Sequence, residues 1–164
     1  MKENLYKYLS GNEYPGRGIC IGKTKSGKLA LIAYFIMGRS VNSRNRVFDP
    51  IDGGIRTLAA DPSKMTDPHL IIYNPVLTLE DTTIVTNGDQ TDTIRNFIAG
   101  SDYPGFGFEA ALNTRTFEDD EPNWTPRISG VVNMRLGGYK LSILKSAGGN
   151  EKSVQRFVSA QSHI

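Results

Sequence analysis

The sequence predicts an α+β fold in which mainly antiparallel sheets are packed in layers with two or three helices. Many short runs of strand-forming residues follow one another, and turn signals separate them at hairpin spacing. Two stretches near the middle of the chain show the helical spacing of apolar residues instead. With 164 residues, 38% of them hydrophobic, the chain is long enough to bury a core in one domain spanning 1–164.

The N-terminal part of the chain is predicted to form a β-hairpin. After an irregular or short helical lead-in over 1–17, strands are expected over 18–24 and 29–37, joined by a polar turn at 25–28. The second run is continuously apolar, which is typical of a strand covered on both faces. The sequence therefore predicts that this hairpin belongs to a layered sheet core.

The remaining elements are predicted from the same two periodicities. A helix is expected between Asp89 or Thr91, which are suitable N-cap residues, and Gly100, which suits a helix end. A shorter helix is expected over 106–112, followed by an acidic loop over 113–126. Strand-like runs bounded by turn residues occur over 55–60, 70–73, 76–79, 82–85, 128–134 and 139–144.

The tail of the chain is predicted to be helical. Val154, Phe157 and Val158 recur at the spacing of one helix face. We find no internal repeat, no low-complexity stretch and no linker that would divide the chain into two domains. All of these elements are therefore expected to share a single core.

Composition excludes several classes of function. A formal net charge of +2 is too small to indicate a nucleic-acid partner. The single cysteine, Cys20, and the two histidines, His69 and His163, form no recognisable metal-ligand spacing, so no metal is expected. Residues 1–11 lack the apolar core of a signal peptide, and the longest apolar run, 29–37, is too short for a membrane helix. We expect no membrane partner and a cytoplasmic location.

The densest polar segment, 38–46, directly follows the apolar run and contains three arginines, two asparagines and two serines. Arginine presents a planar fork of donors that matches phosphate oxygens, and Ser40 and Asn42 add shorter donors. At the end of a strand such a cluster, with Arg39 and Arg44, is suited to holding an anion. A solvated polar loop is an equally good interpretation of composition alone.

Three other segments carry candidate residues beside strands. Asn87 closes a strand and precedes a helix, where its amide is placed to face an anion, although Asn-Gly is also an ordinary turn signal. Arg127 precedes a strand and follows four consecutive acids at 118–121, which are more often solvated surface than proton-transfer groups. Arg17 lies between two glycines, which let the backbone approach a ligand closely or simply form an entry turn.

Five of these segments, in consistent order, resemble the archaeal-type IMP cyclohydrolase family. The resemblance covers roughly 14–145, and the NSRNR sequence is similar to a bacterial branch of the family. The segments that carry it are YPGRGI at 14–19, YFIMGRSVNSRNR at 34–46, YN at 73–74, TNGDQTD at 86–92 and TPRISG at 125–130.

The resemblance implies a fold and a reaction. The fold is a four-layered α-β-β-α sandwich like that of N-terminal nucleophile hydrolases. The reaction closes the ring of 5-formamidoimidazole-4-carboxamide ribotide to give IMP and water, and it requires no cofactor or metal. Bacterial relatives continue past Ile164, where this chain stops, so two expectations are left open: a lacking C-terminal segment or a natural short form.

The resemblance also implies roles for particular residues. The 5′-phosphate falls to Arg17, Arg39, Arg44 and Arg127, with Ser40 and Asn42 as further substrate-binding groups. Tyr73 is expected to donate a hydrogen bond to the formyl oxygen, and Asn74 and Asn87 to orient the reacting groups. Glu118 is the candidate acid/base, with Asp119, Asp120 and Glu121 as alternatives.

Two other functions remain open at this point. One is a catalytically silent protein on the same fold that binds a purine nucleotide but lacks the proton-transfer groups. The other is an amidohydrolase with Cys20 as nucleophile, although its apolar neighbours favour a buried structural thiol. The partner expected in the first two cases is a phosphorylated small molecule, and the sequence also leaves a homo-oligomer open.

Overall fold

Over residues 4–69 and 71–162, the computed structural model is an α+β protein with two antiparallel sheets. A two-stranded ribbon has the order β1-β2, and a seven-stranded sheet has the order β3-β4-β5-β6-β7-β8-β9. The elements in chain order are α1 (Leu5–Ser10), β1 (Arg17–Lys23), β2 (Ala30–Ile36), α2 (Val41–Arg44), β3 (Val47–Ile51), β4 (Gly54–Leu58), the 3-10 turn η1 (Pro62–Lys64), β5 (Val76–Leu79), β6 (Thr82–Thr86), α3 (Gln90–Ala99), α4 (Pro104–Asn113), β7 (Arg127–Asn133), β8 (Gly138–Ser146) and β9 (Val154–Ser162).

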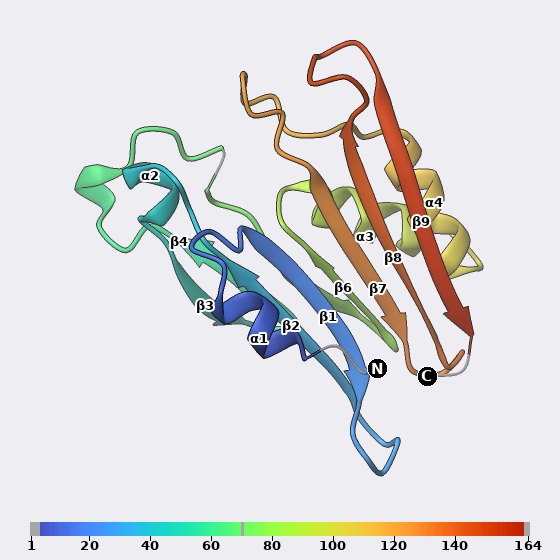
Figure 1. Cartoon of the computed structure of the whole chain (residues 1–164). Coiled ribbons are helices and arrows are strands. Elements are labelled where there is room, and N and C mark those ends of the chain that lie inside the picture. Colours follow the sequence, from blue (N-terminus) through green and yellow to red (C-terminus); the bar gives the residue numbers. More distant parts are fainter. Residues whose placement is uncertain (1–3, 70, 163–164) are drawn as a thin grey trace.

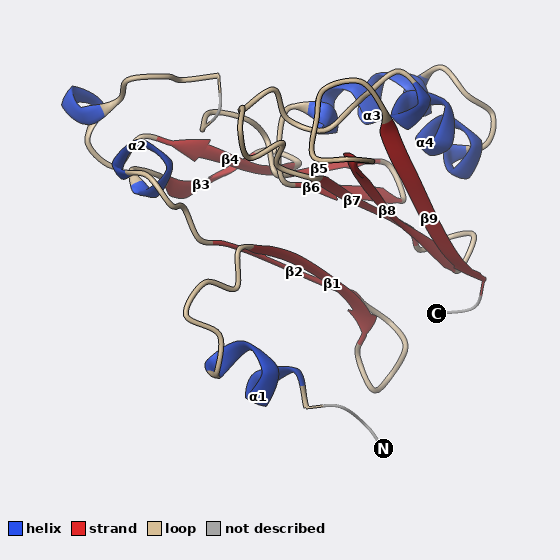
Figure 2. Cartoon of the chain, turned by 45° about the horizontal axis from the view of Figure 1, so that its top comes forward, coloured by secondary structure: helices blue, strands red, loops and turns tan. Residues whose placement is uncertain are grey.

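The elements are stacked in layers, as Figure 2 shows. Helices α3 and α4 cover one face of the large sheet, and the β1–β2 ribbon lies on its other face. The short helix α1 lies beyond the ribbon, on the side away from the large sheet. Figure 1 shows the ribbon crossing in front of β6 and β7, so the middle of the large sheet is covered on both sides.

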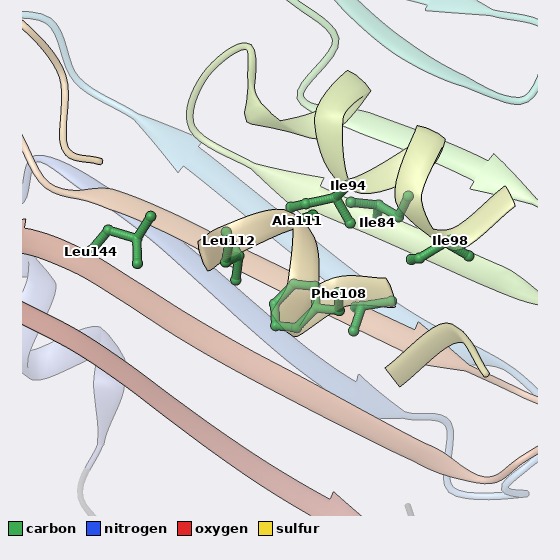
Figure 3. Close-up of a cluster of buried hydrophobic side chains, with 8 residues drawn as sticks. Ile84, Ile94, Ile98, Phe108, Ala111, Leu112 and Leu144 are labelled. Atoms are coloured by element: carbon green, nitrogen blue, oxygen red, sulfur yellow. The ribbon is translucent and has the colours of Figure 1, made fainter. Parts of the chain in front are cut away.

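The hydrophobic core lies between the two helices and the large sheet (Figure 3). One face of each element supplies it, because helical residues three or four apart and alternate strand residues point the same way. Its buried members are Ile84, Ile94, Ile98, Phe108, Ala111, Leu112, Val131 and Leu144. Burial of this apolar surface is the main force that holds α3 and α4 on the sheet.

The ribbon approaches the large sheet at a glycine. A Cβ atom built on Gly130 of β7 lies 2.9 Å from Cδ1 of Ile21 in β1 and 3.1 Å from Cγ1 of Val85 in β6. Any larger residue at this position would have to push Ile21 outward. The absence of a side chain at Gly130 therefore sets how closely β1, which begins at Arg17, packs on the sheet.

Most of the predicted elements are confirmed. The N-terminal hairpin, the strands β4 to β8 and both central helices form within a few residues of their expected bounds. Asp89 is the N-cap position of α3 and Gly100 its C-cap, although the Asp89 side chain makes no capping hydrogen bond. The loop predicted over 113–126 lies between α4 and β7.

The prediction of a C-terminal helix is wrong, because this segment forms β9. It pairs with β8 along its whole length. The residues alternate in strand fashion: Val154 packs against the core, and Arg156 Nη1 donates to the carbonyl of Leu112 in α4. Phe157 instead lies half-exposed, with Lys145 Nζ 5.2 Å from its ring centre. Apolar residues three and four apart thus also fit a strand that uses both of its faces.

Three further expectations need correction. Residues 71–73 form a turn and an irregular segment rather than a strand, and residue 70 lies outside the described residues. Strand β3 was not expected; it contains Pro50, which is tolerated because β3 is an edge strand. The ribbon is not covered on both faces, because Leu31 is 53% exposed.

We predict that Gly130→Val lowers the free energy of unfolding by about 1–3 kcal/mol, because it overpacks the contact between ribbon and sheet. The matched control is Gly22→Val, since Gly22 also lies in a strand but an added Cβ there meets nothing within 4 Å. Urea unfolding of both variants measures the difference. Equal stabilities for the two variants would contradict the proposed packing role of Gly130.

Candidate functional site

A cavity of about 630 Å³ opens where the start of β1, the segment around α2 and the loop before β7 meet. The segments that form it are far apart in the sequence. Its lining residues are Tyr14, Gly16, Arg17, Gly38, Arg39, Ser40, Asn42, Ser43, Ile71, Asn87, Glu118, Asp120, Glu121, Asn123, Thr125, Pro126, Ile128 and Ile143. Six of the predicted site residues are thus brought together: Arg17, Arg39, Ser40, Asn42, Asn87 and Glu118.

A buried ion pair lies in the wall of the cavity. Arg17 Nη1 at the start of β1 is 3.0 Å from Glu118 Oε1, and the side chains are 15% and 6% exposed. Burial raises the pKa of Glu118, which the positive charges of Arg17 and Arg127 only partly oppose. For Arg17, burial is the largest influence and works to lower the pKa, but the charge and hydrogen bond of Glu118 together with Tyr73 and Tyr34 outweigh it, and the pKa is raised. The pair therefore combines a fixed cation with a carboxyl group that takes up a proton more readily than usual.

Hydrogen bonds within the loop hold Glu118 in place. Its backbone N–H donates to the carbonyl of Thr125 at 2.9 Å. The Thr125 backbone N–H and hydroxyl in turn donate to the carboxylate of Asp120, at 2.7 and 2.5 Å. Among the four consecutive acids, Asp120 is thus engaged in shaping the loop, and Asp119 and Glu121 are exposed. Glu118 is the one that is buried and paired.

Arg39 connects two walls of the cavity. Its Nη1 donates to Asn123 Oδ1 at 2.7 Å, and its guanidinium lies 4.9 Å from the centre of the Tyr14 ring. The Tyr14 hydroxyl donates to the carbonyl of Met37 at 3.1 Å. The exposed Arg39 side chain is therefore oriented over the cavity while other donors of its fork remain for a ligand.

The neighbouring polar residues partly hold their own loop. Ser40 is the N-cap of α2 and forms a reciprocal capping box with Ser43. Asn42 Nδ2 donates to the carbonyl of Asp67, and its Oδ1 accepts from the N–H of Thr66. A Cβ at Gly38 would lie 2.4 Å from the backbone of Ser43, so the tight turn requires glycine there. Both interpretations of segment 38–46 thus apply, because the segment lines the cavity and is also an internally bonded loop.

Asn87 lies fully buried at the junction of β6 and β7. Its Oδ1 accepts from the N–H of Ile128 at 2.9 Å and from Gln90 Nε2 at 3.1 Å. Its Nδ2 donates to the carbonyl of Pro126 at 2.9 Å. The carbonyl oxygen is therefore saturated, and only the second N–H of the amide remains for a ligand.

Arg127 lies beside the cavity rather than in its lining. Its Nη1 is 2.6 Å from Asp89 Oδ1 and donates to Gln90 Oε1 at 2.7 Å. A second arginine, Arg115, binds the other oxygen of Asp89 at 2.6 Å. Burial works to raise the pKa of Asp89, but the two arginines outweigh it and lower that pKa. Asp89 is therefore a counter-ion that joins α3 to β7, and Arg127 still contributes positive charge near Glu118.

Tyr73 is buried and is not among the residues that line the cavity. Its hydroxyl lies 2.9 Å from the hydroxyl of Tyr34 in β2, and either oxygen can be the donor. Burial raises the pKa of both tyrosines, while Arg17 and Arg46 favour the ionised forms. The hydroxyl pair thus lies among positive charges, next to the ion pair of Arg17.

The remaining predicted residues lie elsewhere. Arg44 Nε donates to the carbonyl of Gly38, and Arg44 faces a second cavity of about 470 Å³. Asn74 Nδ2 donates to Asp92 Oδ1 at 3.2 Å, away from the main cavity lining. Cys20 is half-buried within β1, opposite Ala33 of β2, and is not part of the lining.

The sequence analysis missed Tyr34, Arg46, Gln90 and Asn123. Tyr34 and Arg46 belong to the segment that carries the family resemblance, which is the signal that pointed to them. Asn123 had no such signal, because only the fold brings it to Arg39.

Within the described residues there is no group of three or more His, Cys, Asp or Glu side chains that could hold a metal ion. None of the helices over 4–69 and 71–162 is long and apolar enough to span a membrane.

A cavity beside a sheet, lined by two arginines and a buried carboxyl group, is of the class of site suited to a small anionic molecule. Comparison with known families makes this more specific. A profile of the family described as IMP cyclohydrolase-like protein matches residues 14–162, and the chain belongs to this family.

Individual relatives agree. The chain is 33% identical over 130 residues to the IMP cyclohydrolase of Methanosphaera stadtmanae, covering 77% of this chain and 61% of that protein. It is 32% identical over 120 residues to the IMP cyclohydrolase of Methanococcus aeolicus, covering 73% and 58%, and 28% identical over 119 residues to that of Methanopyrus kandleri, covering the same shares. The chain therefore spans less than two thirds of the length of these relatives.

We predict that Arg17→Met lowers the free energy of unfolding by about 3–5 kcal/mol at pH 7.5, because it leaves the Glu118 carboxylate buried without a partner. Adding Glu118→Gln should restore part of this loss. Urea unfolding of the two single variants and the double variant measures the coupling between the residues. Additive effects would show that the two groups do not interact.

The loss in Arg17→Met is also expected to shrink as the pH is lowered toward 5. Burial raises the folded-state pKa of Glu118, so the fold favours the protonated form. The contribution of Glu118 to the free energy of unfolding is then greatest below its unfolded-state pKa, about 4.3. This contribution is lost as the pH rises through the folded-state pKa. A loss that does not change with pH would contradict this account.

Proposed function

We propose that this protein is an IMP cyclohydrolase that closes the ring of 5-formamidoimidazole-4-carboxamide ribotide to give IMP and water. The observation that carries the proposal is the buried Arg17–Glu118 pair in the wall of a cavity that Arg39 also lines. Family membership and the names of the relatives support it. A phosphorylated ligand needs cationic anchors, and ring closure needs a proton-transfer group close to them.

The chemistry requires little more than positioning and proton transfer. The carboxamide nitrogen attacks the formyl carbon, forming the new C–N bond, while one of its protons goes to the formyl oxygen. The resulting hydroxyl group then leaves as water, and the proton on the formamido nitrogen is lost as the ring C=N bond forms. Because both reacting groups are attached to neighbouring ring atoms, the substrate itself supplies the proximity.

We assign the proton transfers to Glu118. As a carboxylate it accepts a proton from the attacking carboxamide and passes it to the formyl oxygen. It then accepts the formamido proton and gives it to the departing hydroxyl group, which leaves as water. Its raised pKa suits it to both steps, because a base must be a strong enough acceptor to become the acid that follows. Tyr73 donates to the developing oxyanion through the hydroxyl pair with Tyr34, and the free N–H of Asn87 orients the formyl group.

The phosphate is assigned to Arg39, Ser40 and Asn42, which all line the cavity. Arg39 presents the guanidinium fork that phosphate oxygens prefer. Arg127 and Arg17 add positive charge but are already paired with carboxylates. The substrate-binding roles of Arg44 and Asn74 have the least support, because Arg44 donates to the carbonyl of Gly38 and Asn74 donates to Asp92.

The finer description of the fold is also a proposal. We infer that the order of α1, ribbon, large sheet and the pair α3–α4 is a reduced form of the four-layered arrangement of N-terminal nucleophile hydrolases. The layer order supports this, while the ribbon has only two strands. Cytoplasmic residence is proposed on the ground that nucleotide precursors are made in that compartment.

A turnover assay with the formylated ribotide tests the proposed function directly. The wild-type protein is expected to form IMP, which is followed by its absorbance and by chromatography. A protein that binds IMP but forms none from the formylated substrate would instead be the catalytically silent relative. Iodoacetamide is expected to leave turnover unchanged, because Cys20 does not line the cavity.

We predict that Arg39→Ala raises KM about tenfold or more with a smaller change in kcat, because it removes a charge-assisted bond to a part of the substrate that does not react. Arg56→Ala is the matched control, since Arg56 pairs with Asp49 on the surface, away from the cavity. Steady-state kinetics of both variants give the comparison. An unchanged KM in Arg39→Ala would rule out Arg39 as the phosphate anchor.

We predict that Glu118→Gln lowers kcat by about 10²–10⁴-fold, since the amide cannot carry out the proton transfers. In the wild type, kcat should fall as the pH drops through the raised pKa of Glu118, so the acidic limb lies above the ordinary value near 4.3. In Glu118→Gln this limb should disappear. Asp119→Asn serves as the control, and a limb that persists in Glu118→Gln would assign the titration to another group.

A further inference from the structure

Asp89 lies between two arginines at the point where β6 ends, α3 begins and β7 starts. Its Oδ1 atom is 2.6 Å from Arg127 Nη1, and its Oδ2 atom is 2.6 Å from Arg115 Nη2. The sheet register explains the contact with Arg127, because Thr86 at the end of β6 pairs with Ser129 near the start of β7. The Asp89 side chain is 52% exposed and that of Arg127 only 14%. Asp89 is thus the exposed partner of a largely buried cation.

The hydrogen-bonding capacity of Arg127 Nη1 is fully used by two acceptors. An η nitrogen of arginine carries two hydrogens. One is donated to Asp89 Oδ1 and the other to Gln90 Oε1, at 2.7 Å. Gln90 is itself fixed, because its Nε2 donates to Asn87 Oδ1 at 3.1 Å and to the carbonyl of Ile128 at 3.2 Å. While both acceptors stay in place, Nη1 therefore has no hydrogen left for a third.

Glu118 is the acceptor that Arg127 would otherwise reach. A Cβ atom built on Gly88 would lie 2.5 Å from Arg127 Nη1 and 3.5 Å from Glu118 Oε1, so both atoms border one small space that glycine leaves open. Arg127 and Glu118 nevertheless form no ion pair with each other among the described residues, where the partner of Glu118 is Arg17. That bond uses only Oε1 of the carboxylate. Within the part of the chain that the structure describes, Oε2 accepts no hydrogen bond.

We propose that Asp89 is a positioning residue of the site: with Gln90 it holds the Arg127 guanidinium away from Glu118, which leaves one carboxylate oxygen free for proton transfer. The inference rests on the proposed function for the identity of the protons that Glu118 moves. Asp89 itself does not line the cavity, so it acts on the site only through Arg127.

The charges around Glu118 come from several parts of the chain. Burial is the largest influence on its carboxyl group and raises the pKa, and the charge of Asp120 in the same loop acts in the same direction. Arg17 of β1 and Arg127 of β7 work to lower the pKa, and Tyr73 is a further titratable group that interacts with this carboxyl. A direct ion pair with Arg127 would lower the pKa further, because an opposite charge at closer range favours the ionised form more strongly.

The first experiment measures the titration of Glu118 and does not depend on turnover. The carboxyl resonance is followed against pH by NMR in protein with isotope-labelled glutamate, and Glu118→Gln assigns it. Asp89→Ala removes an acceptor and lets Arg127 turn to Glu118, so the pKa of Glu118 is expected to fall by about one or more. An unchanged pKa of Glu118 in Asp89→Ala would overturn the proposal whether or not the protein is a cyclohydrolase.

Asp92→Ala is the matched control for this titration. It removes an exposed carboxylate from the first turn of the same helix, and that carboxylate pairs with no arginine in the described residues. The titration of Glu118 is therefore expected to stay unchanged. Asp89→Asn keeps one acceptor oxygen without the charge and should give a smaller fall. It decides the matter if Asp89→Ala does not fold, because an unchanged pKa of Glu118 in Asp89→Asn also overturns the proposal.

A double variant shows whether the effect passes through Arg127. In Arg127→Met the pKa of Glu118 is expected to rise, because one of the two cations near it is gone. Adding Asp89→Ala to Arg127→Met should then change this pKa little, since there is no guanidinium left to release. The same fall with and without Arg127 would overturn the proposal, because the lost charge of Asp89 would then act on Glu118 directly.

The kinetic consequence depends on the proposed function. In Asp89→Ala the acidic limb of kcat should move to lower pH together with the pKa of Glu118. At neutral pH kcat should fall about tenfold while KM changes little, since Arg39 is intact. A wild-type protein without turnover contradicts the proposed function, while the titration still tests the role of Asp89. A lower kcat with an unmoved acidic limb, which merely follows a lower unfolding temperature, identifies a structural role and overturns the proposal.

Discussion

The buried ion pair between Arg17 and Glu118 is the contact on which the arrangement of the site depends. It joins two residues 101 positions apart, one at the start of the ribbon and one in the loop that follows α4. Neither charge is stable in this position without the other. The pair therefore fixes the distance between the ribbon and the loop, and the cavity lies between the segments that it connects. Arg39, bonded to Asn123 of the same loop, closes the arrangement from the other side.

The layered fold gives this pair its rigid frame. Gly130 lets the ribbon approach the large sheet, while Asn87 and Asp89 connect the end of β6 and the start of α3 to β7. The Asn87 contacts use backbone groups and a buried side chain, so they tolerate little displacement, whereas the Asp89 side chain is half-exposed. The loops that carry Arg39 and Glu118 are less regular but are held by their own hydrogen bonds. The candidate site thus combines the ends of interior strands with internally bonded loops, which suits a reaction that needs positioning above all.

The sequence predicted much of the fold because most strands and helices follow clear periodicity and end at strong turn signals. It failed where the local pattern was ambiguous. In the tail, Val154 and Phe157 fit helical spacing, but the segment forms a strand because it pairs with β8. Strand β3 was missed, and its edge position is what permits Pro50 within it. Among the candidate site residues, local composition pointed to the arginine-rich segment, part of which lines the cavity, whereas the contact of Arg39 with Asn123 depends on segments far apart in the sequence.

The central claim is that the cavity recognises the phosphate of a purine nucleotide through its cationic wall. Calorimetric titration of the wild-type protein with IMP and with inosine, which differ only in the phosphate group, tests this most directly. The account predicts that IMP binds at least about tenfold more tightly than inosine, and that added salt reduces the difference, because the contact is electrostatic. Equal affinities for the two compounds, or binding of neither, would contradict it.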